Sequence, residues 1–462
     1  MKRIYIILIA ITALNLGACK KFLDVKPKTQ IESEVAFKDE VGYQNALTGI
    51  YVKLTSQSLY GKELTYGMMD VLGRQYTQTP VPYNTFDTYN YQLDSLKKRT
   101  TAIWRDMYNG IANSNNLIEN LNRTDLPAFT GPDYNVIKGE ALGLRAFIHF
   151  DLLRLYAPAP TSSGGMTALA IPYVDKFDSQ NIPRTNVRGV LDKVLADLNT
   201  AAILLKSSDP IVLGNTATNN YLRDRNYKFN YYAVKALQAR VYLYAGDKVN
   251  ALVCAEEVIK SLAFPFAAGA NVTNGNDKLY NSELIFSLNI NNLQSYTAPS
   301  FSNTDTRLAK RAEDYLSDFD GYATDYRFQY ASDAPGGVYR YSTKYTAGAL
   351  ANFLYRMPMI RVSEMYFIAA ECLIVSDKTK AVQYLNAVRR ARNKTDDVSE
   401  TTTDLEIQNQ IFREYRREFI AEGQLFYYYK RVNSPTIEYS AVAANNAVYV
   451  VPLPDDELKY GN

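Results

Sequence analysis

The stretch at residues 231–260, YYAVKALQARVYLYAGDKVNALVCAEEVIK, decides the fold class of this chain. Two apolar segments with helical periodicity flank the turn at residues 245–247, and Ala239 and Ala251 lie twelve positions apart across it. Small side chains at these two places let antiparallel helices approach closely, which is typical of tetratricopeptide repeats. Residues 359–392 repeat the pattern, with Ala369 and Ala381 on either side of a second turn. The stretch therefore predicts a protein built from helical repeats.

Helical periodicity continues over most of the chain. It predicts helices at residues 34–53, 101–122, 135–156, 186–205, 229–245, 248–262, 358–374, 378–392 and 404–431. We expect tetratricopeptide-like helix pairs around residues 34–122, 135–205, 229–262 and 358–392. Two long polar and aromatic stretches, residues 56–98 and 264–356, separate the helical segments. Stretches of that length in a compact domain are usually functional or disordered, and their aromatic content argues against disorder.

The first nineteen residues resemble an export signal with a lipid attachment site. Met1-Lys2-Arg3 is followed by an apolar run over residues 4–14, which is shorter than the roughly 20 residues needed to cross a membrane. The run leads into Leu16-Gly17-Ala18-Cys19, a pattern similar to a bacterial lipobox. We expect a signal peptide at residues 1–18 and lipidation of Cys19. A chance cysteine after an ordinary signal peptide is the alternative.

Composition excludes several classes of partner and chemistry. The net charge is only +3, so nothing favours nucleic acid as a partner. Cys254 and Cys372 stand in apolar helical contexts and are expected to be buried free thiols, although a disulfide between them stays open. The chain has 38 tyrosines against one tryptophan, and tyrosine offers a flat apolar face together with a hydroxyl group.

Catalytic motifs are missing from the sequence. The single histidine, His149, sits among apolar residues of a predicted helix and is interpreted as a packing residue. No phosphate-binding or dinucleotide-binding glycine motif occurs, and no cofactor or metal is predicted. Asp318, Asp320 and Asp325 form an acidic cluster without the spacing of a calcium loop. Hydrolysis by a carboxylate pair stays open, because the separation of two carboxylates cannot be read from sequence.

Motifs in order along the chain resemble the SusD/RagB family of outer-membrane nutrient-binding lipoproteins. They are CKKFLDVKP at 19–27, WRDMYNGIANSN at 104–115, GEALGLRAF at 139–147, IRVSEMY at 360–366, LNAVR at 385–389, RREFIAEG at 416–423 and VPLPDDEL at 451–458. The tyrosine-rich segment at 424–431 departs from the family pattern. Both long stretches also lack the tryptophans of starch-binding members, which argues against a starch-like ligand.

The resemblance implies an all-α fold, with tetratricopeptide-like repeats forming a superhelical scaffold and irregular loop excursions on one side. Residues 19–462 would form a single SusD-like domain, held at the outer membrane by its lipid and facing the cell exterior. It would capture an oligosaccharide, or a peptide as RagB-like members do, and deliver it to a SusC-like TonB-dependent transporter. Such a protein needs no enzymatic activity.

The two long stretches are expected to form the ligand side of the molecule. Sugar faces stack on aromatic rings while polar side chains hold the hydroxyl groups. We expect a surface arc of aromatic side chains with polar partners, drawn from Asp70, Arg74, Tyr76, Tyr83, Asn84, Phe86, Tyr89, Tyr91, Tyr296 and Tyr322. Trp104 lies in a family helix motif and is expected in the core. Two other functions are weighed: a surface glycoside hydrolase or peptidase, and an interaction scaffold without a small ligand.

Overall fold

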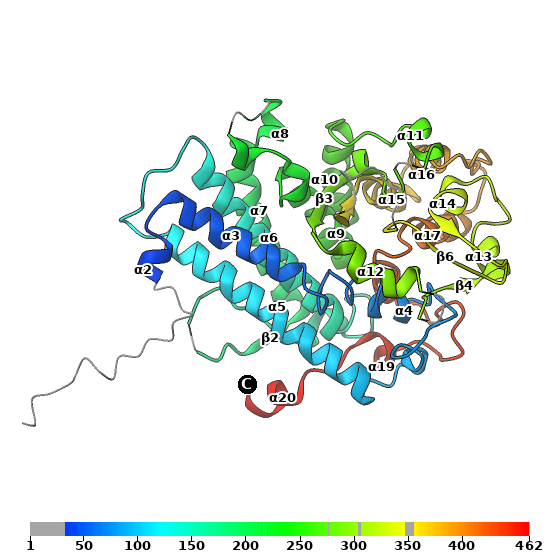
Figure 1. Ribbon diagram of the computed structural model, residues 1–462, viewed down its shortest axis with the longest axis horizontal. Helices are drawn as coiled ribbons and strands as arrows, with labels where there is room; N and C mark the ends of the chain where they lie inside the picture. Colours follow the sequence, from blue (N-terminus) through cyan, green and yellow to red (C-terminus); the bar gives the residue numbers. More distant parts are fainter. Residues whose placement is uncertain are drawn as a thin grey trace, which may run out of the picture.

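A row of long helices, each packed on the next, forms the frame of the molecule. The computed structural model describes residues 33–178, 180–215, 217, 219–275, 277–303, 306–346 and 355–461. The row consists of α3 (Glu40–Leu54), α5 (Asp94–Leu121), α6 (Asp133–Tyr156), α7 (Val187–Lys206), α9 (Tyr231–Ala245), α10 (Lys248–Lys260), α15 (Val362–Leu373), α16 (Lys378–Ala391) and α17 (Asp404–Glu418). Figure 1 shows it running from α3 at one end of the molecule to α16 and α17 at the other. The predicted helical class is confirmed, while the signal peptide and Cys19 lie outside the described residues.

The turns inside the repeats follow from their sequence. Gly246 closes α9 in the left-handed conformation, with φ of 87°. Asp247 caps α10 by accepting a hydrogen bond from the backbone N–H of Asn250, and Asp377 caps α16 in the same way. The four alanines of the repeat pattern have no exposed surface, as close helix packing requires: Ala239, Ala251, Ala369 and Ala381.

Shorter elements fill the space between the long helices. They are α2 (Ser33–Ala36), α4 (Met68–Leu72), η2 (Phe86–Thr88), η3 (Gly165–Thr167), β1 (Leu169–Pro172), β2 (Arg184–Asn186), α8 (Pro210–Leu213), η4 (Asn220–Leu222), η5 (Arg225–Tyr227), α11 (Gly269–Thr273), η6 (Asn281–Glu283), β3 (Leu284–Asn289), α12 (Leu293–Phe301), β4 (Lys310–Arg311), α13 (Ala312–Asp318), α14 (Tyr326–Gln329), β5 (Ser332–Asp333), β6 (Tyr339–Ser342), β7 (Arg356–Arg361), α18 (Leu425–Arg431), α19 (Asn446–Tyr449) and α20 (Asp455–Tyr460). The strands pair antiparallel as β1–β2, β3–β7 and β4–β6–β5. The described parts of the long stretches 56–98 and 264–356 are therefore built mainly of short regular elements joined by turns.

Several helix boundaries differ from those predicted. The segment 34–53 forms two helices, α2 and α3, and α5 begins at Asp94 rather than at residue 101. The segment 358–374 starts as strand β7, which pairs with β3 from Leu284↔Arg361 to Asn289↔Arg356, and becomes helical only at Val362. Pairing with a strand more than sixty positions away overrides the local helical pattern here.

The predicted helix 404–431 is broken between α17 and α18. Ala421 and Gly423 have φ values of 67° and 73°, a conformation that stops an α-helix. The buried carboxylate of Asp70 accepts hydrogen bonds from the N–H groups of both residues, at 2.6 and 2.9 Å. A contact from the first long stretch therefore stabilises the break.

Aromatic side chains supply much of the core. Trp104 is 8% exposed and packs between Tyr108 and Tyr156, with ring centroids 4.7 and 4.8 Å away, which confirms its core position. Cys254 and Cys372 are both free thiols, and burial raises the pKa of Cys372 to about 12. The free-thiol prediction is confirmed, although Cys372 is only partly buried.

His149 is a packing residue, as predicted. Its ring is fully buried and stacks on Tyr173 at 3.9 Å. Nδ1 lies 2.9 Å from the carbonyl oxygen of Arg145, and Nε2 accepts a hydrogen bond of 3.1 Å from the Val174 N–H. Burial lowers the pKa of His149 to about 3, so the ring is neutral at physiological pH with both nitrogens in use.

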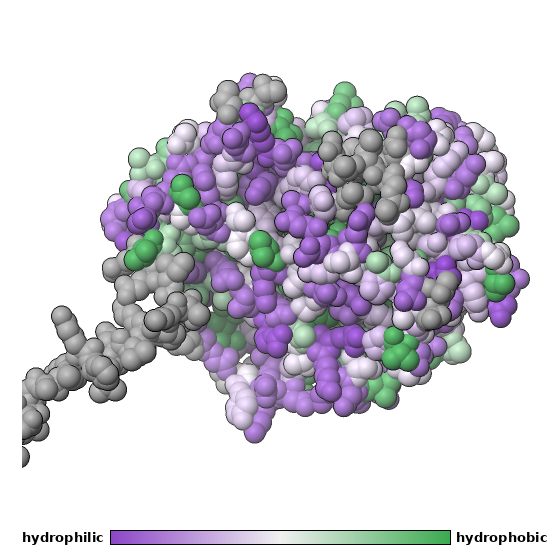
Figure 2. Space-filling model, in the orientation of Figure 1, coloured by the Kyte–Doolittle hydropathy of each residue, from purple (hydrophilic) through white to green (hydrophobic). Residues whose placement is uncertain are grey.

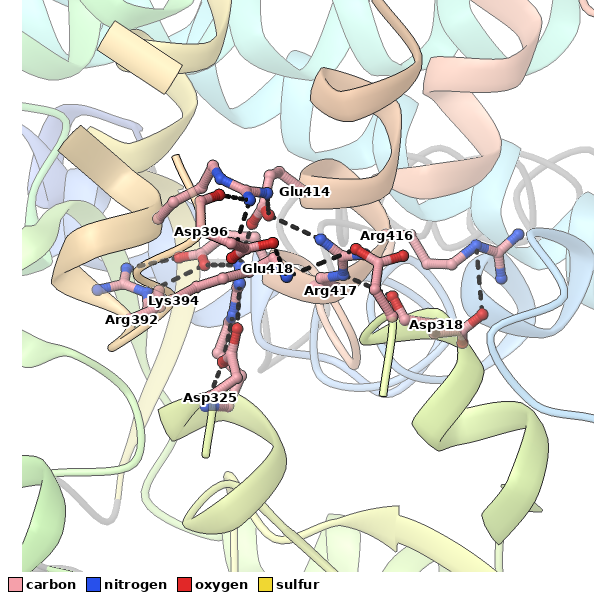
Figure 3. Close-up of polar contacts among 12 residues, drawn as sticks. Asp318, Asp325, Arg392, Lys394, Asp396, Glu414, Arg416, Arg417 and Glu418 are labelled. Atoms are coloured by element: carbon pink, nitrogen blue, oxygen red, sulfur yellow. Dashed lines mark hydrogen bonds and ion pairs between the residues drawn. The ribbon is translucent and has the colours of Figure 1, made fainter. Parts of the chain in front are cut away.

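A buried cluster of ion pairs, shown in Figure 3, joins the second long stretch to α16 and α17. Glu418 accepts hydrogen bonds from Arg327 at 3.0 Å, from Arg392 at 2.6 Å and from Arg361. Arg392 also binds Glu283 through two bonds of 2.7 and 2.6 Å. Burial acts to raise the pKa of Glu418, but the surrounding guanidinium groups hold it well below its ordinary value. The carboxylate is therefore ionised and bridges both parts of the fold.

Glu414, one helical turn before Glu418, extends the same cluster. It accepts hydrogen bonds from Arg389 and Arg417 at 2.9 and 2.7 Å and forms an ion pair of 2.8 Å with Arg327. The side chains of these residues are at most 2% exposed. Such a cluster holds the second long stretch rigidly on the helical frame, because any separation would leave buried charges unpaired.

The face of the molecule shown in Figure 2 is mainly hydrophilic. On the face shown in Figure 2, hydrophobic residues are scattered rather than gathered into one broad patch. Within the described part of the chain, no helix combines the length and the apolar character needed to span a bilayer.

Candidate ligand-binding surface

The aromatic residues predicted in the first long stretch lie inside the protein. The exposed fraction is 6% or less for all five: Tyr76, Tyr83, Phe86, Tyr89 and Tyr91. Their hydroxyl groups donate to internal acceptors, namely Tyr76 to Asp70 (3.3 Å), Tyr83 to Glu63 (3.0 Å), Tyr89 to the Leu72 carbonyl (2.9 Å) and Tyr91 to the Val448 carbonyl (2.7 Å). The expectation that these residues form a surface arc is wrong, because each hydroxyl finds a partner in the interior and the whole ring can be buried.

Asp70 and Arg74, expected as polar partners of a ligand, also hold the fold together. Asp70 has no exposed surface, and burial raises its pKa to about 8 although two backbone N–H groups donate to it. Arg74 is 9% exposed and donates from Nε to the carbonyl oxygen of Tyr439 at 3.0 Å. Both side chains fasten the first long stretch to the C-terminal segment.

Three predicted residues remain accessible. Asn84 is exposed beside η2, while Tyr296 in α12 and Tyr322 after α13 are each partly exposed. The ring of Tyr322 lies 4.0 Å from Nζ of Lys394, so one of its faces meets a cation. The three residues belong to separate segments, and their role in ligand binding stays a prediction.

The structure brings the two long stretches together, as a shared ligand surface requires. Gln78 pairs antiparallel with Ala309, with backbone hydrogen bonds of 2.8 and 3.1 Å between them. The Tyr66 hydroxyl donates to the carbonyl oxygen of Tyr296 at 2.9 Å. Residues more than 200 positions apart therefore form one continuous surface at this place.

We call this surface the loop junction and define it by Thr77, Gln78, Tyr296, Arg307 and Tyr341, all of which are partly exposed. The Arg307 guanidinium lies 4.6 Å from the centroid of the Tyr341 ring, and its Nε makes no hydrogen bond. A planar cation over an aromatic ring suits a polar ligand that has an apolar face. Arg307, Tyr341 and Gln78 were missed by the sequence analysis, since only strand pairing brings them to one place.

The acidic cluster considered for calcium is occupied by cations from the protein. Asp318 pairs with Lys310 at 2.5 Å, Asp320 with Arg417 at 2.5 Å and Asp325 with Arg327 at 2.6 Å. Positively charged side chains therefore already pair with these carboxylates, in the place that a calcium ion would take. Among the described residues, no group of three histidine, cysteine or acidic side chains is arranged to hold a metal ion.

The fold and this surface define a class of protein: a helical-repeat frame that carries a rigid, polar and aromatic loop surface. Two family models match adjoining parts of the chain. One, described as starch-binding and associating with the outer membrane, matches residues 21–243, and the SusD family model matches residues 274–459. The chain belongs to the SusD family, whose members are binding proteins associated with the outer membrane.

Relatives and solved structures agree with this assignment. A SusD-like protein of Formosa agariphila is 24% identical over 98% of this chain and 97% of its own length. Two others from that organism are 24% and 25% identical, and the chain spans about half the length of each, 49% and 45%. The crystal structure of a SusD superfamily protein from Bacteroides vulgatus has a TM-score of 0.73 at 20% identity, covering 91% of this chain and 97% of that one. A SusD-like carbohydrate binding protein from the same organism also has a TM-score of 0.73, at 18% identity, covering 92% and 96%. These structures share the fold.

Proposed function

We propose that this protein binds oligosaccharides at the cell surface without cleaving them. The observation that carries the proposal is that SusD-type family models match nearly the whole chain, with one of them described as starch-binding. The carbohydrate binding protein from Bacteroides vulgatus, which shares the fold, gives further support. The single histidine has both ring nitrogens engaged inside the core, which removes it as a catalytic base.

The loop junction is the site that we propose for the sugar. Tyr341 and Tyr296 provide rings for stacking, while Arg307 and Gln78 provide donors and acceptors for hydroxyl groups. The guanidinium of Arg307, a partly exposed residue, supplies N–H donors for ligand oxygens. Asn84 is the exposed residue of the first long stretch that we keep as a further candidate.

Delivery to a transporter completes the proposal. The protein would be tethered to the outer membrane through lipidated Cys19 and would pass its ligand to a SusC-like TonB-dependent transporter. Three acyl chains on Cys19 would give stable attachment, since each buried methylene contributes about 0.8 kcal/mol. The lipobox-like Leu16-Gly17-Ala18-Cys19 after a short apolar run supports the tether.

Binding is tested by isothermal titration calorimetry of the purified protein against neutral oligosaccharides and peptides. The variant Arg307→Ala/Tyr341→Ala should bind the selected sugar at least about tenfold more weakly, since charged hydrogen bonds and aromatic contacts each contribute about 1 kcal/mol or more. The matched control Arg390→Ala/Tyr460→Ala changes an exposed arginine and an exposed tyrosine elsewhere and should bind normally. Unchanged affinity in the first variant would remove the loop junction as the site, and a ligand found only among the peptides would favour the RagB-like alternative.

The tether and the absence of catalysis need separate tests. Cys19→Ser should abolish incorporation of labelled palmitate and release the protein from the membrane fraction, whereas Cys254→Ser should leave both unchanged. Incubation with a fluorescently labelled form of the bound glycan should yield no shorter products. Turnover of that glycan by the purified protein would contradict the proposal.

A further inference from the structure

Two adjoining hollows lie along one face of α17, and together we call them the α17 groove. One has a volume of about 400 Å³ and is bounded by Arg413 and Arg416 of the helix and by Tyr439. The other has a volume of about 270 Å³ and is bounded by Gln408 and Phe412 of the same helix. Glu438 lines both hollows, so they lie side by side. None of the loop-junction residues lines either hollow.

Arg416 gives the groove a fixed hydrogen-bond donor. Its side chain is 2% exposed, and Nη2 donates to the Tyr429 hydroxyl at 2.6 Å and lies 2.9 Å from the Glu438 carboxylate. Its Nε is buried and makes no hydrogen bond, and Oδ1 of Asp318 is 4.0 Å away from it. Figure 3 shows Arg416 and Asp318 facing each other from α17 and α13. The Asp318 carboxylate already accepts hydrogen bonds from Lys310 and from the Tyr439 hydroxyl, so a ligand hydroxyl that entered here would satisfy the Nε donor of Arg416.

The charges of the groove are already compensated within the protein. Asp318 pairs with Lys310 at 2.5 Å, and Asp320 pairs with Arg417 at 2.5 Å and with Arg413 at 3.3 Å. The groove therefore offers donors and acceptors together without an excess of either charge. This pattern suits a neutral ligand rich in hydroxyl groups better than a phosphate or a strongly basic peptide.

Aromatic side chains line the remaining walls. Phe412 lies 5.5 and 5.2 Å from the rings of Tyr428 and Tyr429, and all three border the smaller hollow. Tyr439 borders the larger hollow and is 36% exposed. Tyr428 and Tyr429 are only 4% and 3% exposed, so the rings that can stack on the apolar faces of sugar rings are those of Phe412 and Tyr439, which are partly exposed.

We propose that the α17 groove is a second glycan-binding site, which holds a neutral oligosaccharide and shares no lining residue with the loop junction. The proposal rests on the proposed glycan-binding function and adds a site to it. Two sites on one protein retain a long glycan through multivalent contact, because release from one leaves it held at the other. The ordered side chains of α17 fit this role, since the buried ion-pair cluster immobilises their helix.

The test combines hydrogen–deuterium exchange with calorimetry on the full-length purified protein. The probes are maltoheptaose, cellohexaose, xylohexaose and mannohexaose. The groove variant is Arg413→Ala/Glu438→Gln, in which both side chains are exposed, so that folding is preserved. Its matched control is Arg390→Ala/Glu400→Gln, an exposed arginine and glutamate outside the groove. The loop-junction variant Arg307→Ala/Tyr341→Ala is measured in parallel.

We expect at least one sugar to slow exchange in residues 404–418 and 432–440. The protection should persist in the loop-junction variant and in the control, and it should be lost in the groove variant together with a fall in affinity of about tenfold. Sugar binding with protection confined to the loop junction overturns the second site and leaves the proposed function intact. If no sugar binds at all, both the second site and the proposed function fail.

Discussion

Replacing Glu418 by glutamine tests whether the buried ion-pair cluster holds the long second stretch on the helical frame. The carboxylate has no exposed surface and accepts bonds from three arginines, Arg327, Arg361 and Arg392. Glutamine keeps the shape of the side chain but replaces one acceptor oxygen with an NH2 group. That group would face guanidinium N–H donors, and the three arginines would lose one negative charge among them.

The magnitude follows from burial and from the size of the chain. Removing one partner of a buried ion pair costs about 3–5 kcal/mol, and full burial of Glu418 leaves no solvent screening to reduce this. An unfolding entropy of about 2.1 cal/mol/K per residue over 462 residues is about 1 kcal/mol/K. Glu418→Gln should therefore lower Tm by about 3–5 °C.

Differential scanning fluorimetry and urea unfolding measure this change, and limited proteolysis locates it. New cleavage sites should appear in residues 264–356 before they appear in the repeats. The control Asp397→Asn removes one half of a surface ion pair with Arg390 and should leave Tm nearly unchanged. The cluster does not fasten the second long stretch if Glu418→Gln has the same Tm as the parent protein, or if the first new cleavage sites lie in the helical repeats.

Three further predictions concern pH and backbone conformation. Burial opposes ionisation of Glu414, but Arg327, Arg417 and Arg389 hold its pKa at about 2, below the unfolded value of about 4.3. The ionised Glu414 therefore stabilises the fold fully above the unfolded pKa, and this stability is lost as pH falls from about 5 to 2. The urea midpoint should fall over this range, and a midpoint that does not change with pH would refute the pairing. His149 has a folded pKa of about 3 against about 6.5 unfolded, so protonation of the unfolded chain removes stability as pH falls below about 6.5. Between pH 6.5 and 5.5, His149→Gln should lose about 1 kcal/mol less of its free energy of unfolding than the parent protein. An equal loss in both proteins would count against a neutral buried ring. Gly423→Ala should unfold the protein or lower Tm far more than Gly246→Ala. Both glycines have positive φ, but only at Gly423 would a Cβ lie 2.3 Å from the Leu64 carbonyl oxygen. Gly246→Ala should cost only about 1–2 kcal/mol, and equal effects of the two changes would show that movement relieves the contact at Gly423.

Repeat periodicity was readable because it is local. Ala239 and Ala251 mark a close helix crossing by their size and spacing alone, and Gly246 marks the turn between the helices. The packing role of His149 was also readable, since a lone histidine among apolar residues has nothing nearby with which to act. These features depend on residues within one or two helical turns of each other.

The candidate site was harder to predict, because the sequence does not show whether a tyrosine packs its ring and hydroxyl group in the core or presents them to a ligand at the surface. Tyr83 and Tyr91 look like surface aromatics in a polar stretch, but their hydroxyls meet Glu63 and the Val448 carbonyl inside the protein. Arg307 and Tyr341 were not predicted, because nothing in the sequence shows that the Arg307 guanidinium lies 4.6 Å from the centroid of the Tyr341 ring. A polar stretch can thus be interior whenever distant segments supply its hydrogen-bond partners.

By itself the sequence determined the helical class, the repeat turns, the family motifs and the packing role of the one histidine, since each rests on short-range periodicity, composition or residue identity. Only the tertiary structure decided which aromatic rings are buried, where β7 displaces a helix, and how Glu418 gathers three arginines around it. The physical reason is that burial, strand pairing and ion pairing are interactions between segments tens to hundreds of residues apart, whose energies depend on distances that exist only after folding.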